Sequence, residues 1–121
     1  MTSKSPKELT GVERIAVERA RQVSEENYDA LHDDEHDAGE LALAAACYAA
    51  YVAERRIFVM TEFAAGPHFS DPWPWDVVFD KRTYDGNTVK VTKLSSAKAV
   101  RMLEKAGALI AAEIDRLLRA R

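Results

Sequence analysis

The sequence predicts a mainly α-helical fold with a three-helix core, in which a Trp-Pro loop and a short β-hairpin separate the second helix from the third. Apolar residues recur at steps of three and four near both ends of the chain, as is typical of amphipathic helices. Residues 41–53 are apolar without interruption, and prolines and tryptophans crowd residues 67–75, where no helix can continue. With 121 residues, the chain fits a single domain over residues 1–121.

The first helix is predicted over about residues 6–27. Two capping boxes mark its start, Ser5 with Glu8 and Thr10 with Glu13, because each pair can satisfy the free backbone N–H groups of a first turn. The apolar face of this helix consists of Leu9, Val12, Ala16, Ala20 and Val23.

The second helix is predicted over about residues 34–63, with Asp33 or Asp34 as its N-cap. Its segment 41–53 is apolar on every face, which is typical of a helix surrounded by protein. We therefore expect this Ala-rich helix to be the central one. The Gly-Pro pair at residues 66–67 ends it.

A loop and hairpin are predicted over residues 66–93. The apolar run 77–79 and the β-branched run 88–92 flank an Asp-Gly pair at residues 85–86, and such a pair favours a tight turn between two strands. A hairpin this short needs packing against the helices to be stable.

The last helix is predicted over about residues 96–120, capped by Ser95 or Ser96. A heptad spacing of apolar residues indicates that this helix packs along its length against another helix, of the same chain or of a second copy. We expect a homo-oligomer that forms through this helix. The heptad stripe consists of Val100, Leu103, Gly107, Ile110, Ile114 and Leu117.

Charge is distributed unevenly along the chain. The net charge is −3, yet eight of the 20 acidic residues fall within residues 25–40, which contain no Lys or Arg, and residues 81–105 are strongly basic. The isoelectric point of about 5.6 argues against a duplex nucleic acid partner. No apolar run reaches the ~20 residues of a membrane span, and the N-terminus lacks a secretory signal, so a cytoplasmic protein is expected.

The loop and the basic segment together predict a binding site for a small phosphorylated nucleotide. Trp73, Trp75 and Tyr84 offer rings on which a base can stack. The cations that we expect to hold the phosphates are Arg82, Lys90, Lys93 and Arg101. No catalytic residue and no cofactor are predicted for this site. Alternatively, the tryptophans pack the loop over the helices without binding anything.

The acidic segment favours a second hypothesis, a metal-dependent nucleotide phosphohydrolase. Two histidines at i and i+4 face one way on a helix, the spacing of a zinc-binding helix, and carboxylates on adjacent turns suit Mg²⁺ or Mn²⁺. The candidate ligands are His32, Asp33, His36, Asp37 and Glu40. The alternative is a solvated, acidic helix start. A third hypothesis is a module that binds a host protein through the heptad stripe.

Several segments, taken in their order along the chain, carry a resemblance to known proteins. They are Glu18-Arg19-x-Arg21-Gln22, His32-Asp33-Asp34-Glu35-His36, the Gly39-Glu40-Leu41-Ala42 run as far as Ala49, Trp73-Pro74-Trp75 and residues 105–117. In these segments the chain resembles a family of small uncharacterised proteins of bacteriophages and prophages. The resemblance implies a phage-encoded accessory protein in the cytoplasm of a bacterial host, which sequesters a nucleotide signal of anti-phage immunity.

The segment Gly39-Glu40-Leu41-Ala42, with Asp37 three residues before Glu40, carries a weaker resemblance. It resembles part of the metal-binding helix of the all-α nucleoside-triphosphate pyrophosphatases, which implies the hydrolase.

Overall fold

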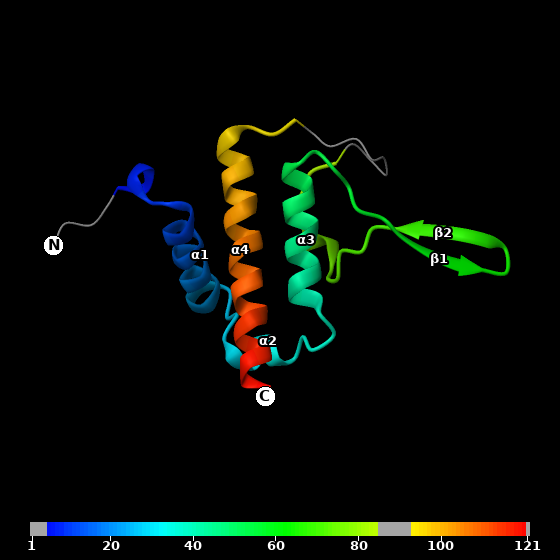
Figure 1. The fold of residues 1–121 in the computed structure, drawn as a ribbon, viewed down its shortest axis with the longest axis horizontal. Helices are drawn as coiled ribbons and strands as arrows, with labels where there is room; N and C mark the ends of the chain where they lie inside the picture. Colours follow the sequence, from blue (N-terminus) through cyan, green and yellow to red (C-terminus); the bar gives the residue numbers. More distant parts are fainter. Residues whose placement is uncertain (1–4, 85–92, 121) are drawn as a thin grey trace.

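The structure is a computed structural model, and it describes residues 5–84 and 93–120. The described chain is mainly α-helical, as the sequence predicts (Figure 1). None of its helices is both long enough and apolar enough to cross a membrane. The elements in chain order are a 3₁₀ turn η1 (Pro6–Glu8), α1 (Gly11–Glu25), α2 (Ala30–Asp34), α3 (Glu40–Val52), β1 (Val59–Phe63), β2 (Gly66–Ser70), a second 3₁₀ turn η2 (Val77–Phe79) and α4 (Ser96–Arg119).

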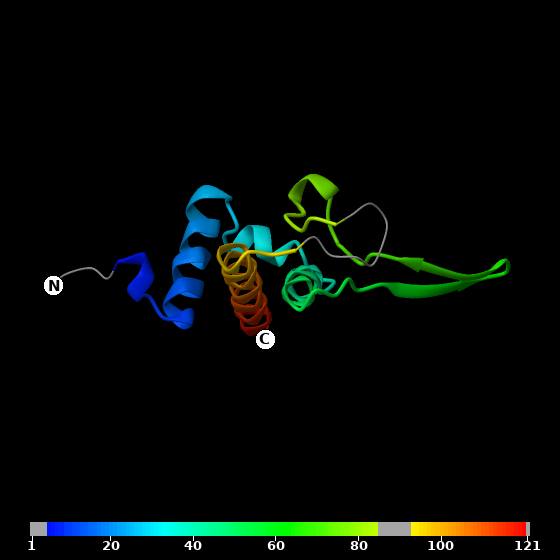
Figure 2. The same ribbon diagram turned by 90° about the horizontal axis from the view of Figure 1, so that it is seen from above.

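The helix at the centre of the fold is α4. It packs against α3, α1 and α2, and in Figures 1 and 2 it stands between α1 and α3. The prediction that the Ala-rich helix α3 is central is therefore wrong. Ala42, Ala46 and Ala49 on its outer side are exposed. An exposed alanine adds little apolar surface, so an uninterrupted run of small apolar residues does not require protein on every side.

The two N-terminal capping boxes form two separate turns. The Ser5 box opens η1, Leu9 is extended, and the Thr10 box then opens α1. The Thr10 backbone N–H donates to Glu13 Oε1 at 3.0 Å, and the Glu13 N–H donates to Thr10 Oγ1 at 3.3 Å. Helix α1 ends at Glu25, close to the predicted end at residue 27, because Asn27 takes a left-handed conformation with φ of 58°.

The predicted helix 34–63 is divided into α2, α3 and β1. Gly39, with φ of 82°, separates α2 from α3, and Glu54, with φ of 58°, follows the end of α3. Positive φ at both places breaks the helix. Residues 59–63 then pair with residues 66–70 as an antiparallel hairpin around Ala64 and Ala65.

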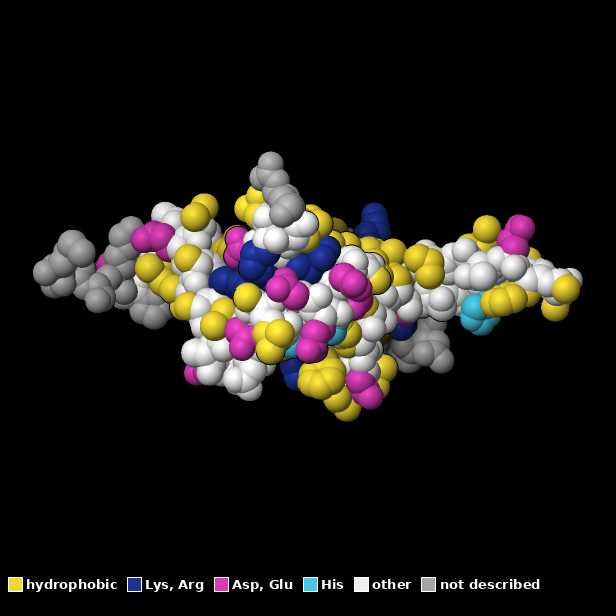
Figure 3. All heavy atoms as spheres, turned by 90° about the horizontal axis from the view of Figure 1, so that it is seen from below, with side chains coloured by type: hydrophobic (Ala, Val, Ile, Leu, Met, Phe, Trp, Pro, Cys, Tyr) yellow, Lys and Arg dark blue, Asp and Glu magenta, His cyan; other side chains and the backbone are white. Residues whose placement is uncertain are grey.

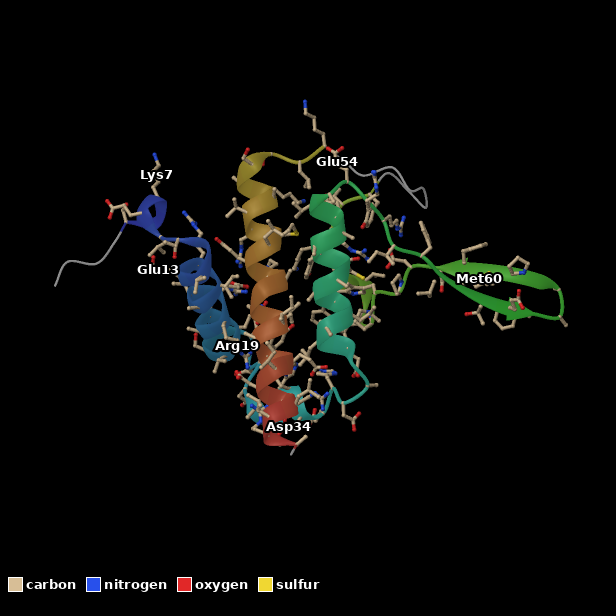
Figure 4. All side chains as sticks on the ribbon, in the orientation of Figure 1. Lys7, Glu13, Arg19, Asp34, Glu54 and Met60 are labelled. Atoms are coloured by element: carbon tan, nitrogen blue, oxygen red, sulfur yellow. The ribbon has the colours of Figure 1, made fainter. Side chains whose placement is uncertain are left out.

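The β-hairpin therefore lies earlier in the chain than predicted. The predicted strand 77–79 is η2 instead, because the Asp76 carboxylate accepts a hydrogen bond from the Val78 N–H at 3.0 Å and closes a helical turn. The predicted partner strand 88–92 lies outside the described residues. The observed hairpin projects away from the helices, with hydrophobic side chains exposed along it (Figure 3) and Met60 pointing into solvent (Figure 4).

The apolar core lies between α3 and α4. Helix α4 begins at the predicted place, where Ser95 Oγ accepts from the Lys98 N–H at 3.2 Å. Aromatic side chains of the segments around residues 28, 73–75 and 84 pack against the core from one side. The buried core residues are Leu41, Ala44, Ala45, Tyr48, Tyr51, Met102, Ala106, Leu109 and Ala112.

Candidate functional site

An aromatic-walled pocket lies where α1, α3 and α4 meet residues 71–76, which follow β2 and are called the Trp-Pro loop from here on. Its cavity measures about 70 Å³. Five of the ten lining residues are aromatic, and two lysines, one glutamate and one glutamine add polar groups. The lining residues are Gln22, Glu26, Tyr28, Tyr48, Trp73, Trp75, Phe79, Lys81, Lys105 and Leu109.

The loop holds its tryptophans through a local hydrogen-bond network. Asp71 Oδ1 accepts from the Trp73 N–H at 2.9 Å, and the Trp73 indole N–H donates to the Asp76 carbonyl at 3.2 Å. The ring centroids of Trp73 and Trp75 lie 5.7 Å apart, with the planes at 89°. This edge-to-face geometry is the favourable one for aromatic pairs, and it leaves the two rings facing different directions.

Tyr48 fixes the loop against α3. Its hydroxyl donates to the Phe79 carbonyl at 3.2 Å and accepts from the Lys81 N–H at 3.3 Å. The Tyr48 and Trp73 rings meet edge to face, 5.2 Å apart. Burial raises the pKa of Tyr48 well above its usual range, so this hydroxyl remains a hydrogen-bond donor at physiological pH.

Two buried polar atoms of residues lining the pocket have no partner among the described residues. They are the side-chain oxygen Oε1 of Gln22 and the indole nitrogen Nε1 of Trp75. The amide nitrogen of Gln22 does have a partner, Glu18 Oε2 at 3.4 Å. A buried polar atom without a hydrogen bond costs roughly 1–3 kcal/mol, so any group that bonds to these two atoms stabilises the protein by recovering that cost.

A buried carboxylate anchors the cations on the α1 side of the pocket. Glu18 contacts Arg21 at 2.7 Å, Arg101 at 2.8 Å and Lys105 at 3.8 Å. Burial alone would raise the pKa of Glu18, but the hydrogen bonds from Arg21 and Arg101 outweigh it and lower the pKa to about 2. Burial, followed by the nearby charge of Arg101, lowers the pKa of Lys105 below its usual value.

Among the residues predicted to stack on a base, Trp73 and Trp75 line this pocket and Tyr84 does not. The Tyr84 ring packs edge to face against Tyr51, with centroids 5.3 Å apart, and the Arg56 guanidinium lies 4.3 Å from its centroid. Tyr84 therefore packs in a separate cluster with Tyr51 and Arg56, next to the pocket.

Of the residues predicted to hold phosphates, the three that the structure describes do not line the pocket. The Arg82 side chain is only 1% exposed, and its guanidinium donates to Asp71, to Asp80 and to the hydroxyl of Tyr84. Arg101 pairs with Glu18 and Glu104. Lys93 is exposed and does not line the pocket, and Lys90 lies outside the described residues.

Sequence reasoning missed Gln22, Tyr28, Tyr48 and Lys105 as lining residues. Tyr48 and Lys105 lie within predicted helices, but nothing in one sequence aligns the faces of helices that are far apart in the chain. Tyr28 gives the clearest available signal, because it is a lone aromatic residue in an otherwise polar linker.

The two histidines of the acidic segment each pair with a neighbouring carboxylate. His32 Nδ1 lies 2.9 Å from Asp33 Oδ1, and His36 Nδ1 lies 2.9 Å from Glu40 Oε2. Asp33 is buried, and its other oxygen accepts from Arg19 at 2.6 Å. Figure 4 shows Arg19 on the lower half of α1 and Asp34 beside the end of α4, where it pairs with Arg119.

The histidine rings extend the aromatic wall. His32 stacks on Tyr28 with centroids 4.3 Å apart, and His36 meets Trp75 edge to face at 5.4 Å. Within residues 5–84 and 93–120, no three His, Cys, Asp or Glu side chains are grouped so that they could hold a metal ion. Asp37, the remaining predicted ligand, is exposed. The segment in this arrangement supports the pocket wall.

No protein-family model matches the chain, and searches of curated proteins and of solved structures found no match either. The resemblance to phage proteins therefore stays a prediction from the sequence.

Proposed function

We propose that the aromatic pocket binds the base of a small phosphorylated nucleotide. The observation that carries this proposal is the pair of unpartnered buried atoms, one acceptor on Gln22 and one donor on Trp75, beside aromatic rings. The edge of a nucleobase carries donors and acceptors side by side, and its faces stack on aromatic rings. In the proposed complex the base lies against the aromatic rings, and the side chains of Gln22 and Trp75 turn to bond to its edge.

The size of the cavity limits what can enter. At about 70 Å³ it is far smaller than the ~300 Å³ or more of a pocket that encloses a drug-sized ligand. A cavity of this size accepts a single base better than a whole dinucleotide, so in the proposed complex the sugar and phosphates lie outside the opening of the pocket. Lys81, which is exposed, and Lys105 are the lining cations that can meet them.

The proposed phosphate contacts are Lys81 and Lys105, and not Arg82, which the sequence suggested. Arg82 is engaged by two carboxylates, and freeing it would leave those charges partly buried and unpaired. In the proposed complex Arg82 positions the loop, while Lys81 and Lys105 contact the ligand.

The proposed protein holds its nucleotide without converting it. The resemblance to phage proteins suggests a use for such a protein, namely sequestering a host signal of anti-phage immunity. The hydrolase hypothesis has no specific observation in its favour, because four of its candidate ligands form the pairs His32–Asp33 and His36–Glu40, and the described residues contain no group of three that could hold a metal ion.

The test is calorimetric titration with a panel of mononucleotides and cyclic nucleotides, with and without Mg²⁺, followed by mass spectrometry of the nucleotide. Trp75→Phe keeps an aromatic ring and removes the unpartnered N–H, so we expect affinity to fall by about tenfold. Tyr84→Phe removes a hydroxyl that bonds to Arg82 outside the pocket, and should bind as the wild type does.

Equal affinity of Trp75→Phe and the wild type would exclude the pocket as the binding site. Absence of binding across the panel would refute the proposal as a whole. Conversion of the nucleotide would replace it with the hydrolase hypothesis.

A further inference from the structure

One side of the helical layer is left uncovered. The Trp-Pro loop lies on one side of α3 and α4, and Figure 2 shows no described segment over these two helices on the opposite side. At 100° per residue, Ile114 lies about 180° around α4 from the pocket residue Lys105, and Ala46 lies about 160° around α3 from Tyr48. Both helices therefore present an outer row of apolar side chains away from the pocket.

We call this surface the open face. Its α4 row is a ridge of large side chains, each roughly half exposed, and its α3 row consists of exposed alanines. No position in either row is charged. The open face consists of Val100, Leu103, Ile110, Ile114 and Leu117 on α4 and of Ala42, Ala46 and Ala49 on α3.

The ridge is the heptad stripe of the sequence, and α3 does not use it. Helix α4 contributes a different row to the apolar core shared with α3, which includes Met102, Ala106 and Leu109. Helix α1 covers the stripe at Gly107, where a Cβ would lie 2.5 Å from the Ile15 side chain, and it borders Val100 and Leu103, which line a groove with Ile15. At Ile110, Ile114 and Leu117 the stripe stays about half exposed, so the described part of the chain does not supply the packing partner that the heptad spacing implies there.

We propose that a second copy of this chain covers the open face, with the α4 ridge of each copy packed on the α3 alanines of the other. A two-fold interface requires a surface that is complementary to itself. Large side chains beside a row of small ones meet that requirement, because the ridge of one copy fits the shallow row of the other.

The area of the open face matches a dimer. Its five large side chains are each 41–52% exposed. They leave on the order of 400 Å² of apolar surface per copy before the alanines are counted, which is about the apolar share of the ~800 Å² that each partner buries in a stable protein–protein interface. Monomeric proteins rarely leave a continuous apolar patch of that size in water.

The test is the oligomeric state of the full chain over a range of concentrations, measured by sedimentation velocity. We expect the wild type to be a dimer and Ile114→Asp to be a folded monomer, because a carboxylate buried without a partner raises the dissociation constant by about 100-fold or more. Val17→Asp is the matched control. Val17 is 59% exposed against 52% for Ile114, lies on α1 outside the open face, and should leave the dimer intact.

Far-ultraviolet circular dichroism is the control for folding, and we expect both variants to be folded because Ile114 and Val17 are both exposed. A wild type that stays monomeric at high concentration would overturn the proposal, and so would a dimer that Ile114→Asp does not weaken. A monomer that instead binds lipid vesicles through Ile114 would assign the open face to a membrane surface and would likewise overturn it.

Discussion

The pH dependence of stability should be dominated by Glu18 in the acid range. This carboxylate is 3% exposed and hydrogen-bonds to Arg21 and Arg101, and its pKa is lowered from 4.5 to about 2. Each unit of pKa corresponds to about 1.4 kcal/mol, so the charged form of Glu18 contributes about 3 kcal/mol to the free energy of unfolding. A lowered pKa means that this contribution is complete above pH 4.5 and is lost as the pH falls towards 2.

The perturbation that tests this is Glu18→Gln, which keeps the shape of the side chain and removes its charge. Urea unfolding followed by circular dichroism, at one protein concentration and at several pH values between 7 and 2, gives the free energy of unfolding. We expect the variant to be about 3 kcal/mol less stable at pH 7 and equal to the wild type near pH 2. Glu25→Gln is the control: Glu25 is an exposed partner of Arg21, so its loss should lower the free energy of unfolding by less than about 1 kcal/mol. Parallel stability curves for Glu18→Gln and the wild type would refute the reasoning.

Two further substitutions test the packing of α1 and of the loop. Gly107→Ala should lower the free energy of unfolding by about 1–2 kcal/mol, because the new Cβ overlaps the Ile15 side chain. Ile15→Val removes the nearest overlapping carbon, so the double variant should regain part of the lost stability in thermal unfolding. Arg82→Met should lower the free energy of unfolding by about 3 kcal/mol or more, because it leaves Asp71 and Asp80 without their shared cation. The near-ultraviolet circular dichroism signal of the tryptophans should weaken at the same time, because the loop that carries them is less firmly held.

The helix boundaries that the sequence predicted well are those with a strong local signal. At α4, the Ser95 cap and an unbroken periodic stripe agree, and the helix starts within one residue of the prediction. At α1, a left-handed Asn27 sets the end close to the predicted residue 27, whereas the start, predicted at about residue 6, lies at Gly11, where the second capping box opens the helix. Local hydrogen bonding decides these positions, and local hydrogen bonding is what a single sequence records.

Predictions failed where backbone conformation or long-range packing decides. Residues 59–63 follow the apolar run closely enough to continue a helical pattern, but positive φ at Glu54 ends α3 before them. In the same way, the sequence identifies Trp73 and Trp75 as notable but cannot show that Lys105, some 30 residues later, lines the same pocket. Arg82 was predicted to be a phosphate ligand because the sequence does not show that the chain brings Asp71 back to its guanidinium, where the neighbouring Asp80 also binds.

The proposed pocket and the proposed dimer interface share α4 but use different sides of it. Lys105 and Leu109 line the pocket, whereas Ile110 and Ile114 lie on the open face. Pairing two copies through the open face therefore leaves both pockets accessible, and a dimer should bind two ligands independently. If Ile114→Asp were to abolish nucleotide binding as well as dimerisation, the two sides of α4 would be coupled. That coupling would have to pass through a shift of the helix itself, because no described side chain belongs to both surfaces.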